Sequence, residues 1–389
     1  MASSQDINDI RRHNIPVVYA RGNHYDVGFD VGRTFSAMIK DFVSKSALLN
    51  SSYLPIYNTP QGKKVYNETL EVVTKSFPQY LRELQGVADG AGVEFYKLFL
   101  FHLDEILPNV AKQRSSGIEP TGCSTVYVNG DKEEILGHTE DASRDSLNAF
   151  YLVSAHIISQ EPEGKYGVKV EKFTSLCYAG HLPGYTMSYN HHGLILTINT
   201  LVARTLNGKK TPRHFITRAL LAAENYDEAI KILKDFGVGA ADGCSLNLTF
   251  LNGFDERKFY NIELGPALPS SDESLLDIQA FGTGECSIHC NNYLRLKVLE
   301  CVDPYMNSTK ERYQTLIKFS EPRSLKGIIQ MLGDQTGENW IFRDRPGPVN
   351  KTICVGIFDL KRRTWSLYKD NPKTNEPLLI LHLELKNQK

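Results

Sequence analysis

Residues 122–142 read GCSTVYVNGDKEEILGHTEDA and carry the clearest structural signal in the chain. The segments CSTVYV and EEILGH flank the polar segment NGDK, and this pattern predicts two antiparallel strands joined by a tight turn. If Val128 faces Glu133 across that turn, then Cys123 faces His138. The hairpin therefore begins with a cysteine that directly follows a glycine.

A cysteine at the start of a strand permits a particular chemistry if the chain is cut just before it. Cleavage of the Gly122–Cys123 bond would give Cys123 a free α-amine, whose ordinary pKa of about 7.7 to 8.0 suits a base at neutral pH. Nucleophile and base would then belong to one residue, whereas most cysteine hydrolases use a histidine to activate the thiol. Glycine suits the position before the cut, because it has no side chain to obstruct attack on its carbonyl.

Asp141 extends this hypothesis. It follows His138 by three residues, past the expected end of the paired strands, and could fold over the start of the first strand. Its carboxylate would there orient the amine of Cys123 and tune its pKa. Both residues also have ordinary structural interpretations, because buried cysteines commonly begin strands and an aspartate alone is a common residue at a strand end.

Other polar residues suggest weaker hypotheses. Asn247, in the segment GCSLNLTFLN, has the pattern of a polar residue on a half-buried strand. The segment CSIHC contains Cys286, His289 and Cys290, which raises the question of a metal site. Three ligands without a second cysteine pair favour a structural role instead. The sequence thus predicts no metal and no cofactor.

The composition bounds the class of protein. The 389 residues are 41% apolar and 23% charged, which is typical of a globular protein, and the net charge of −1 argues against nucleic acid as a partner. No apolar stretch reaches the length of a membrane span, and the polar N-terminal segment lacks a signal region, so we expect a cytoplasmic protein without membrane contact. The seven widely spaced cysteines predict reduced thiols rather than a disulfide framework.

The pattern of elements suggests layers of sheet and helix. The first 120 residues are mostly helical in pattern, strands dominate from Cys123, and two helical patterns, RHFITRALLAAE and YDEAIKILKDF, interrupt them. Further helices are expected over 307–319 and 324–333, followed by C-terminal strands. Because no linker separates two parts, we expect one domain over residues 1–389.

The stretch GCSTVYVNGDKEEILGHTEDA resembles the nucleophile region of the penicillin acyltransferase family of N-terminal-nucleophile hydrolases. Other segments resemble that family in the same order: GNHYDVGFDVG, ELQGVADGAGV, GHLPGYTMSYNHHGLILTIN, PRHFITRALL and YDEAI. The segment HCNNYL stands where the family usually has an Asn-His pair, but Asn292 replaces the histidine, so no role is carried over for it. The ordered matches span about residues 18 to 370.

The resemblance implies an α+β fold of the four-layer αββα sandwich type. It also implies self-cleavage between Gly122 and Cys123, giving an α chain (1–122) and a β chain (123–389) that remain associated. Cys123 would be the nucleophile, Asp141 would position it, and Asn247 would stabilise the oxyanion.

Within the family, the chain is most similar to insect members that remove β-alanine from N-β-alanyldopamine and from carcinine (β-alanylhistamine), in pigmentation and in histamine recycling. The resemblance therefore implies small-molecule β-alanyl amines as substrates, a Cys123 thioester as the intermediate, and allows a dimer of the processed heterodimer. Two alternatives stay open: an acyltransferase or amidase that acts on other acyl amides, and an uncleaved scaffold without catalysis.

Overall fold

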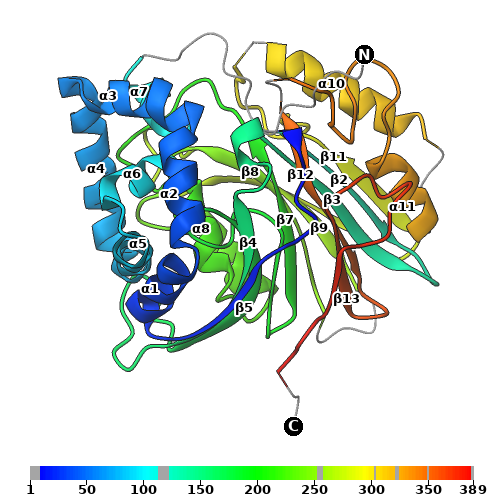
Figure 1. The fold of residues 1–389 in the computed structure, drawn as a ribbon, viewed down its shortest axis with the longest axis horizontal. Coiled ribbons are helices and arrows are strands. Elements are labelled where there is room, and N and C mark those ends of the chain that lie inside the picture. Colours follow the sequence, from blue (N-terminus) through cyan, green and yellow to red (C-terminus); the bar gives the residue numbers. More distant parts are fainter. Residues whose placement is uncertain are drawn as a thin grey trace.

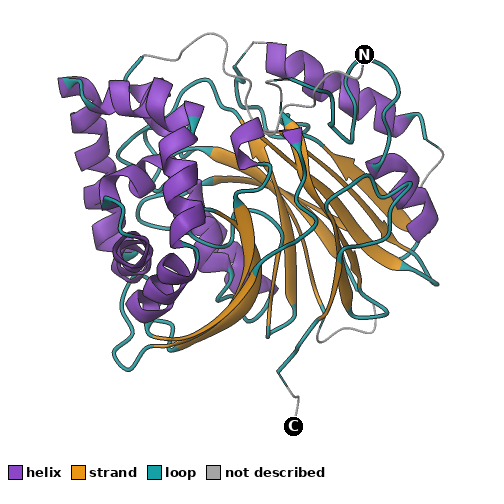
Figure 2. Ribbon diagram, in the orientation of Figure 1, coloured by secondary structure: helices purple, strands orange, loops and turns teal. Residues whose placement is uncertain are grey.

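The computed structural model of the chain describes residues 9–112, 122–251, 257–301, 304–319, 324–347 and 350–386. Two β-sheets lie face to face in the centre, with helices against them (Figures 1 and 2). The polar loop that precedes Gly122 lies outside the described residues. This mixture of helices with two largely antiparallel sheets agrees with the α+β class expected from the sequence.

The larger sheet has eight strands in the order β1, β4, β5, β6, β7, β8, β9, β10. Their bounds are β1 (Val17–Gly22), β4 (Phe150–Ile158), β5 (Val170–Tyr178), β6 (Ser188–Asn190), β7 (Leu194–Leu201), β8 (Gly243–Phe250), β9 (Phe259–Gly265) and β10 (Leu275–Phe281). All neighbours pair antiparallel except β1 and β4, which are parallel.

The smaller sheet has six strands in the order β11, β2, β3, β12, β13, β14, and all of its pairs are antiparallel. Their bounds are β2 (Gly122–Asn129), β3 (Glu134–Ala142), β11 (Glu285–His289), β12 (Lys351–Asp359), β13 (Thr364–Tyr368) and β14 (Leu379–His382). The two strands of the predicted hairpin, β2 and β3, thus lie inside this sheet, where almost every residue is buried.

Helices cover the outer faces of the two sheets (Figure 1). Those beside the larger sheet are α1 (His24–Thr34), α2 (Ser36–Lys45), α3 (Leu54–Tyr57), α4 (Pro60–Ser76), α5 (Pro78–Ala91), α6 (Phe95–Phe101), α7 (Ile106–Val110), α8 (Arg213–Leu220) and α9 (Tyr226–Lys234). Those beside the smaller sheet are α10 (Pro304–Ile317) and α11 (Leu325–Leu332), which correspond to the helices expected over 307–319 and 324–333.

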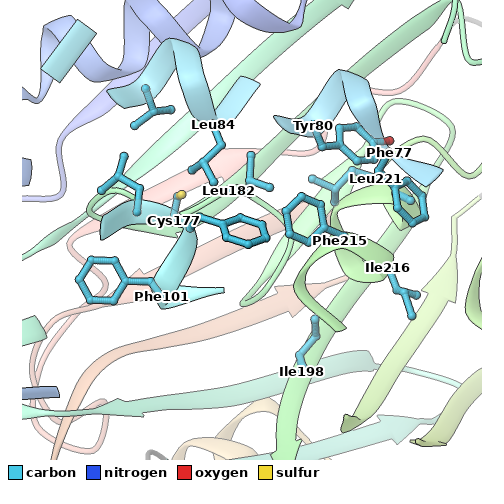
Figure 3. Packing of buried hydrophobic residues seen from close by; sticks show 14 of the residues in the cluster. Phe77, Tyr80, Leu84, Phe101, Cys177, Leu182, Ile198, Phe215, Ile216 and Leu221 are labelled. Carbon is cyan, nitrogen blue, oxygen red and sulfur yellow. The ribbon is translucent and has the colours of Figure 1, made fainter. Parts of the chain in front are cut away.

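Close packing of α1 on α5 explains the glycines near the N-terminus. A Cβ atom at Gly28 would lie 2.0 Å from the carbonyl oxygen of Glu83, and one at Gly32 would lie 2.2 Å from that of Val87. A side chain at either position would therefore push the two helix backbones apart. Further along, aromatic and aliphatic side chains of α5, α8 and the larger sheet, including Tyr80 and Phe215, fill the space between helices and sheet (Figure 3).

The hairpin forms as predicted, but its register differs from the expected one by two residues. Val128 pairs with Ile135, and Cys123 pairs with Glu140 rather than His138. The centre of the turn lies one residue later than expected. The N–H of Gly130 donates to the carbonyl of Glu133 at 2.8 Å, so that only Asp131 and Lys132 remain in the loop. A shift by an even number of residues keeps every side chain on its face of the sheet.

In the part of the chain that the structure describes, no helix is long and apolar enough to cross a membrane.

Candidate active site

Cys123 is the second residue of β2, is 4% exposed and faces the larger sheet. Thr125, two residues further along and therefore on the same face, hydrogen-bonds to Asn199 of β7 at 2.9 Å and to Asn247 of β8 at 3.2 Å. The thiol of Cys123 thus lies at one end of the interface between the sheets. Strand β3 fixes the backbone of Cys123 on one side through the pair Cys123–Glu140, whereas β11 pairs with β2 only as far as Thr125.

Asn291 contacts the backbone nitrogen on which the cleavage hypothesis depends. The N–H of Cys123 donates to its Oδ1 at 2.7 Å, and its Nδ2 donates to the carbonyl of Thr200 at 3.0 Å. Strand β11 pairs with β2 as far as His289, and two more residues bring Asn291 opposite Cys123. A side-chain oxygen therefore takes the place of the strand carbonyl that would otherwise hold this nitrogen.

Arg312 of α10 holds the same backbone from the outer face of the smaller sheet. Its Nη1 donates to the carbonyl of Cys123 and to Oγ of Ser124, both at 2.8 Å, and its Nη2 donates to Oδ1 of Asn291 at 2.8 Å. The side chain is completely buried. Asn291 and Arg312 were not identified from the sequence as site residues.

These two side chains give a second reason for glycine before the cysteine. A Cβ atom at Gly122 would lie 3.0 Å from Nη2 of Arg312 and 3.2 Å from Oδ1 of Asn291. Both contacts are tighter than an ordinary van der Waals contact, so any side chain at position 122 would displace the groups that hold Cys123.

Asp141 lies at the start of the first strand, as expected, but it belongs to the β-ladder instead of following it. It pairs with Gly122, is completely buried, and accepts a hydrogen bond from Oγ1 of Thr352 at 2.6 Å. Nε of Arg343 lies 3.5 Å from its Oδ2. Burial raises the pKa of Asp141, although the charges of Arg343 and Arg312 act in the opposite direction.

Glu140, the cross-strand partner of Cys123, lies on the same face as the thiol. Its Oε1 accepts a hydrogen bond from the hydroxyl of Tyr178 at 2.5 Å, and its Oε2 lies 3.2 Å from Nε2 of His138. Burial, followed by the negative charges of Glu140 and Asp141, raises the pKa of the Cys123 thiol well above its ordinary value. The thiol of the uncut chain is therefore protonated at neutral pH.

Asn247 lies on β8, and its amide takes part in a network between the sheets. Its Nδ2 donates to Oδ1 of Asn199 at 2.8 Å and to Oγ1 of Thr125, while its Oδ1 accepts from Nδ2 of Asn261 at 2.8 Å. Among the described residues, these contacts lead to Thr125, whereas Asn291 is the amide that contacts Cys123 itself.

Possible metal ligands meet at the nucleophile rather than in the segment CSIHC. Sγ of Cys123 and one ligand atom each of His138 and Glu140 all lie within 4.8 Å of one another. His289, by contrast, has its Nε2 3.2 Å from Glu263 and its Nδ1 2.6 Å from the carbonyl of Cys290.

The comparisons with known proteins agree with the family resemblance. A sequence profile described as acyl-coenzyme A:6-aminopenicillanic acid acyl-transferase matches residues 128–374, more than half of the chain, and begins just after Cys123. The chain is also 54% identical over 372 residues to the β-alanyl-dopamine/carcinine hydrolase of Drosophila melanogaster, covering 94% of this chain and 96% of that protein. The chain therefore belongs to the acyl-coenzyme A:6-aminopenicillanic acid acyl-transferase family.

Proposed function

We propose that this protein is a self-processing cysteine amidohydrolase that cleaves β-alanyl amides of biogenic amines, namely N-β-alanyldopamine and carcinine. The observation that carries this proposal is the 54% identity to a hydrolase named for those two substrates, over nearly the full length of both chains. The position of Cys123 supports it further, because Asn291 and Arg312 hold the backbone N–H and carbonyl of Cys123, directly after the proposed cleavage bond.

The proposed architecture is the four-layer αββα sandwich of N-terminal-nucleophile hydrolases, formed by residues 1–389 as one domain. Cleavage before Cys123 would leave β1 in the α chain and β4 in the β chain, and these strands pair from Val17 and Leu152 to Gly22 and Ile157. Helix α1 of the α chain also packs against β4, and the α-chain helices share one buried core with the larger sheet, most of which belongs to the β chain. These contacts support an α and a β chain that stay together after the cut.

Self-cleavage would begin with attack of the Cys123 sulfur on the carbonyl carbon of Gly122. The thiol loses its proton, the Cys123 nitrogen gains one as the C–N bond breaks, and a thioester forms between Gly122 and Sγ. Water then hydrolyses the thioester, which gives Gly122 a carboxylate and Cys123 a free thiol and α-amine. The amine replaces the amide N–H that donates to Asn291 in the uncut chain.

Turnover would use the same sulfur on the substrate amide. The α-amine takes the thiol proton and delivers it to the leaving amine, a β-alanyl thioester remains on Cys123, and water releases β-alanine. Asp141 would position the nucleophile. For the oxyanion, the family resemblance favours Asn247. Asn291 is a second candidate because, although its Oδ1 accepts from Cys123, its Nδ2 carries a second N–H besides the one donated to Thr200.

A denaturing gel with N-terminal sequencing of each band tests the processing step. Purified wild type should give two bands, and the larger should begin Cys-Ser-Thr-Val. Cys123→Ala should remain one band, and Cys286→Ala, which removes a thiol from the adjacent strand β11, should process normally. Full activity in an uncut chain would favour a different mechanism, and an uncut, inactive wild type would favour the scaffold alternative.

A panel of substrates tests the acyl specificity. Hydrolysis of β-alanyldopamine and β-alanylhistamine should be efficient, because the acyl site must replace water around an ammonium group and rejects acyl groups that leave it unpaired. N-acetyldopamine and fatty acyl amides should be poor substrates. If one of the latter is the better substrate, the alternative of an amidase or acyltransferase for other acyl groups replaces this proposal.

A further inference from the structure

We propose that the carboxylate of Glu140 binds the ammonium group of the β-alanyl moiety and thereby selects the acyl group. This inference rests on the proposed function, because it assigns a residue to the substrate group that distinguishes β-alanyl amides from simple acyl amides. The residue is Glu140 alone, which directly precedes Asp141 in β3.

The first argument is the position of Glu140 relative to the nucleophile. Glu140 and Cys123 are cross-strand partners, so their side chains project from the same face of the smaller sheet. Sγ of Cys123 and a carboxylate oxygen of Glu140 lie within 4.8 Å of each other. An acyl group bound to Cys123 therefore has this carboxylate as a close neighbour.

The second argument is the charge of the site. The side chain of Glu140 is 6% exposed, and the groups that contact it are the hydroxyl of Tyr178 and the ring of His138. No lysine or arginine among the described residues forms an ion pair with it. The ring of His138, 3.2 Å away, is the contacting group that can carry a positive charge, and a substrate ammonium would add a permanent one beside this buried carboxylate.

Other buried carboxylates near the site already have such partners. Asp141 lies 3.5 Å from Arg343, and Asp242 forms an ion pair with Arg213 at 3.0 Å. Further away, Glu83 and Glu171 share Arg218, at 2.7 and 2.6 Å. Glu140 differs from all four, which makes it the carboxylate best suited to receive a cation from outside the protein.

The third argument is the length of the acyl group. Two methylene groups separate the β-alanyl carbonyl carbon from the nitrogen, and each bond in this chain is about 1.5 Å long. An acyl carbon bonded to Sγ of Cys123 therefore keeps its ammonium within a few bond lengths of the sulfur. That short reach matches a carboxylate within 4.8 Å of Sγ.

The test compares β-alanyldopamine with propionyldopamine, which has the same carbon chain but lacks the ammonium. Wild type should prefer the β-alanyl compound strongly. Glu140→Gln should lower the ratio of kcat/KM for the β-alanyl compound to kcat/KM for the propionyl compound by about a hundredfold or more. The ratio of the two values is the readout, because any effect on the Cys123 nucleophile is common to both substrates.

Two further variants sharpen the comparison. Glu140→Asp keeps the charge on a shorter side chain and should shift the preference toward 4-aminobutyryldopamine, whose acyl group is one methylene longer. Glu285→Gln removes a carboxylate from the exposed start of β11 and should keep the wild-type ratio. The appearance of two bands on a gel shows that each variant has folded and processed.

The outcomes separate this inference from the proposed function. If wild type cleaves β-alanyl amides but Glu140→Gln lowers both kcat/KM values equally, Glu140 serves the nucleophile or the fold and the inference is wrong. The same conclusion follows if His138→Gln, and not Glu140→Gln, abolishes the preference for the ammonium. If wild type cleaves neither β-alanyl substrate, the proposed function and this inference fail together.

Discussion

Glu140 and Asp141 are adjacent carboxylates in β3 that face opposite sides of the smaller sheet. Glu140 faces the larger sheet together with Cys123 and contacts Tyr178. Asp141 contacts Thr352 and Arg343 on the other side. The alternation of side chains along a strand therefore brings two negative charges to Cys123 from two directions, where both raise the pKa of its thiol.

Asp141→Asn should block processing, turnover or both, without loss of stability at neutral pH. Burial raises the pKa of Asp141 in the folded state above its unfolded value of about 4. Above about pH 4, ionised Asp141 therefore lowers the free energy of unfolding, and this loss is absent at lower pH. The variant should melt no lower than wild type at pH 7, and any advantage should disappear in acid. Thr352→Val, which removes a hydrogen bond but keeps the charge, is the control. Near-normal processing and rates in Asp141→Asn would exclude this residue from the site.

Gly122→Ala should slow self-cleavage by about ten- to a hundredfold, since a small displacement of reacting groups has effects of that size. The added methyl group would press on Arg312 and Asn291, which hold the Cys123 backbone. A time course of band conversion on a gel measures the rate. Gly282→Ala is the matched control, because the nearest atom to its added Cβ is 3.7 Å away. Equal rates in the two variants would mean that the close contacts at position 122 do not limit processing.

The two asparagine candidates can be separated by parallel substitution. Loss of an oxyanion donor costs about a hundred- to a thousandfold in kcat, so the variant that shows this loss identifies the donor. We expect Asn247→Ala to lose hydrolysis, and Asn291→Ala to impair processing as well, because it also releases the Cys123 nitrogen. Asn261→Ala, which removes a partner of Asn247 without contacting Cys123, is the control. Normal turnover in Asn247→Ala would transfer the oxyanion role to Asn291.

The sequence predicted the part of the site that lies in one hairpin, because a hairpin is specified by neighbouring residues. Alternation and a turn signal were enough to place Cys123 and Asp141 at the same end of one hairpin, although a one-residue error in the turn changed the partner of Cys123 from His138 to Glu140. The even shift preserved the faces, so the inference that Cys123 and His138 share a face holds. The hairpin is predictable because its contacts lie close together in the sequence.

Asn291 and Arg312 could not be found in this way. They reach Cys123 across separations of 168 and 189 residues, and their positions depend on the pairing of β11 with β2 and on the packing of α10. A buried arginine has no local signature, since in a helical pattern it looks like an exposed residue. In HCNNYL, Asn291 takes the asparagine position of the family's Asn-His pair, but nothing in the local pattern indicates that it contacts Cys123.

Zinc should inhibit the processed enzyme, although we expect no metal in its catalysis. Cys123, His138 and Glu140 offer a thiolate, an imidazole and a carboxylate within 4.8 Å of one another, which are the ligand types that Zn²⁺ prefers. Bound zinc would block the sulfur of Cys123 and, at the same time, the carboxylate of Glu140 that we propose binds the substrate ammonium. Initial rates at increasing Zn²⁺ should therefore fall, with relief by added β-alanyldopamine and full recovery on adding EDTA.

Two measurements show whether these residues bind zinc: the Zn²⁺ concentration for half inhibition of each variant, and the rate with EDTA alone. Glu140→Gln should require a higher Zn²⁺ concentration for half inhibition, measured with propionyldopamine so that the loss of the substrate contact does not interfere. Glu285→Gln should respond as wild type does, because its carboxylate is remote from Cys123 on the exposed start of β11. EDTA without added zinc should leave the rate unchanged, since a thiol paired with its own α-amine needs no metal to attack an amide. Loss of activity on chelation, restored by zinc, would mean instead that these three residues hold a catalytic metal and that the cysteine mechanism is wrong.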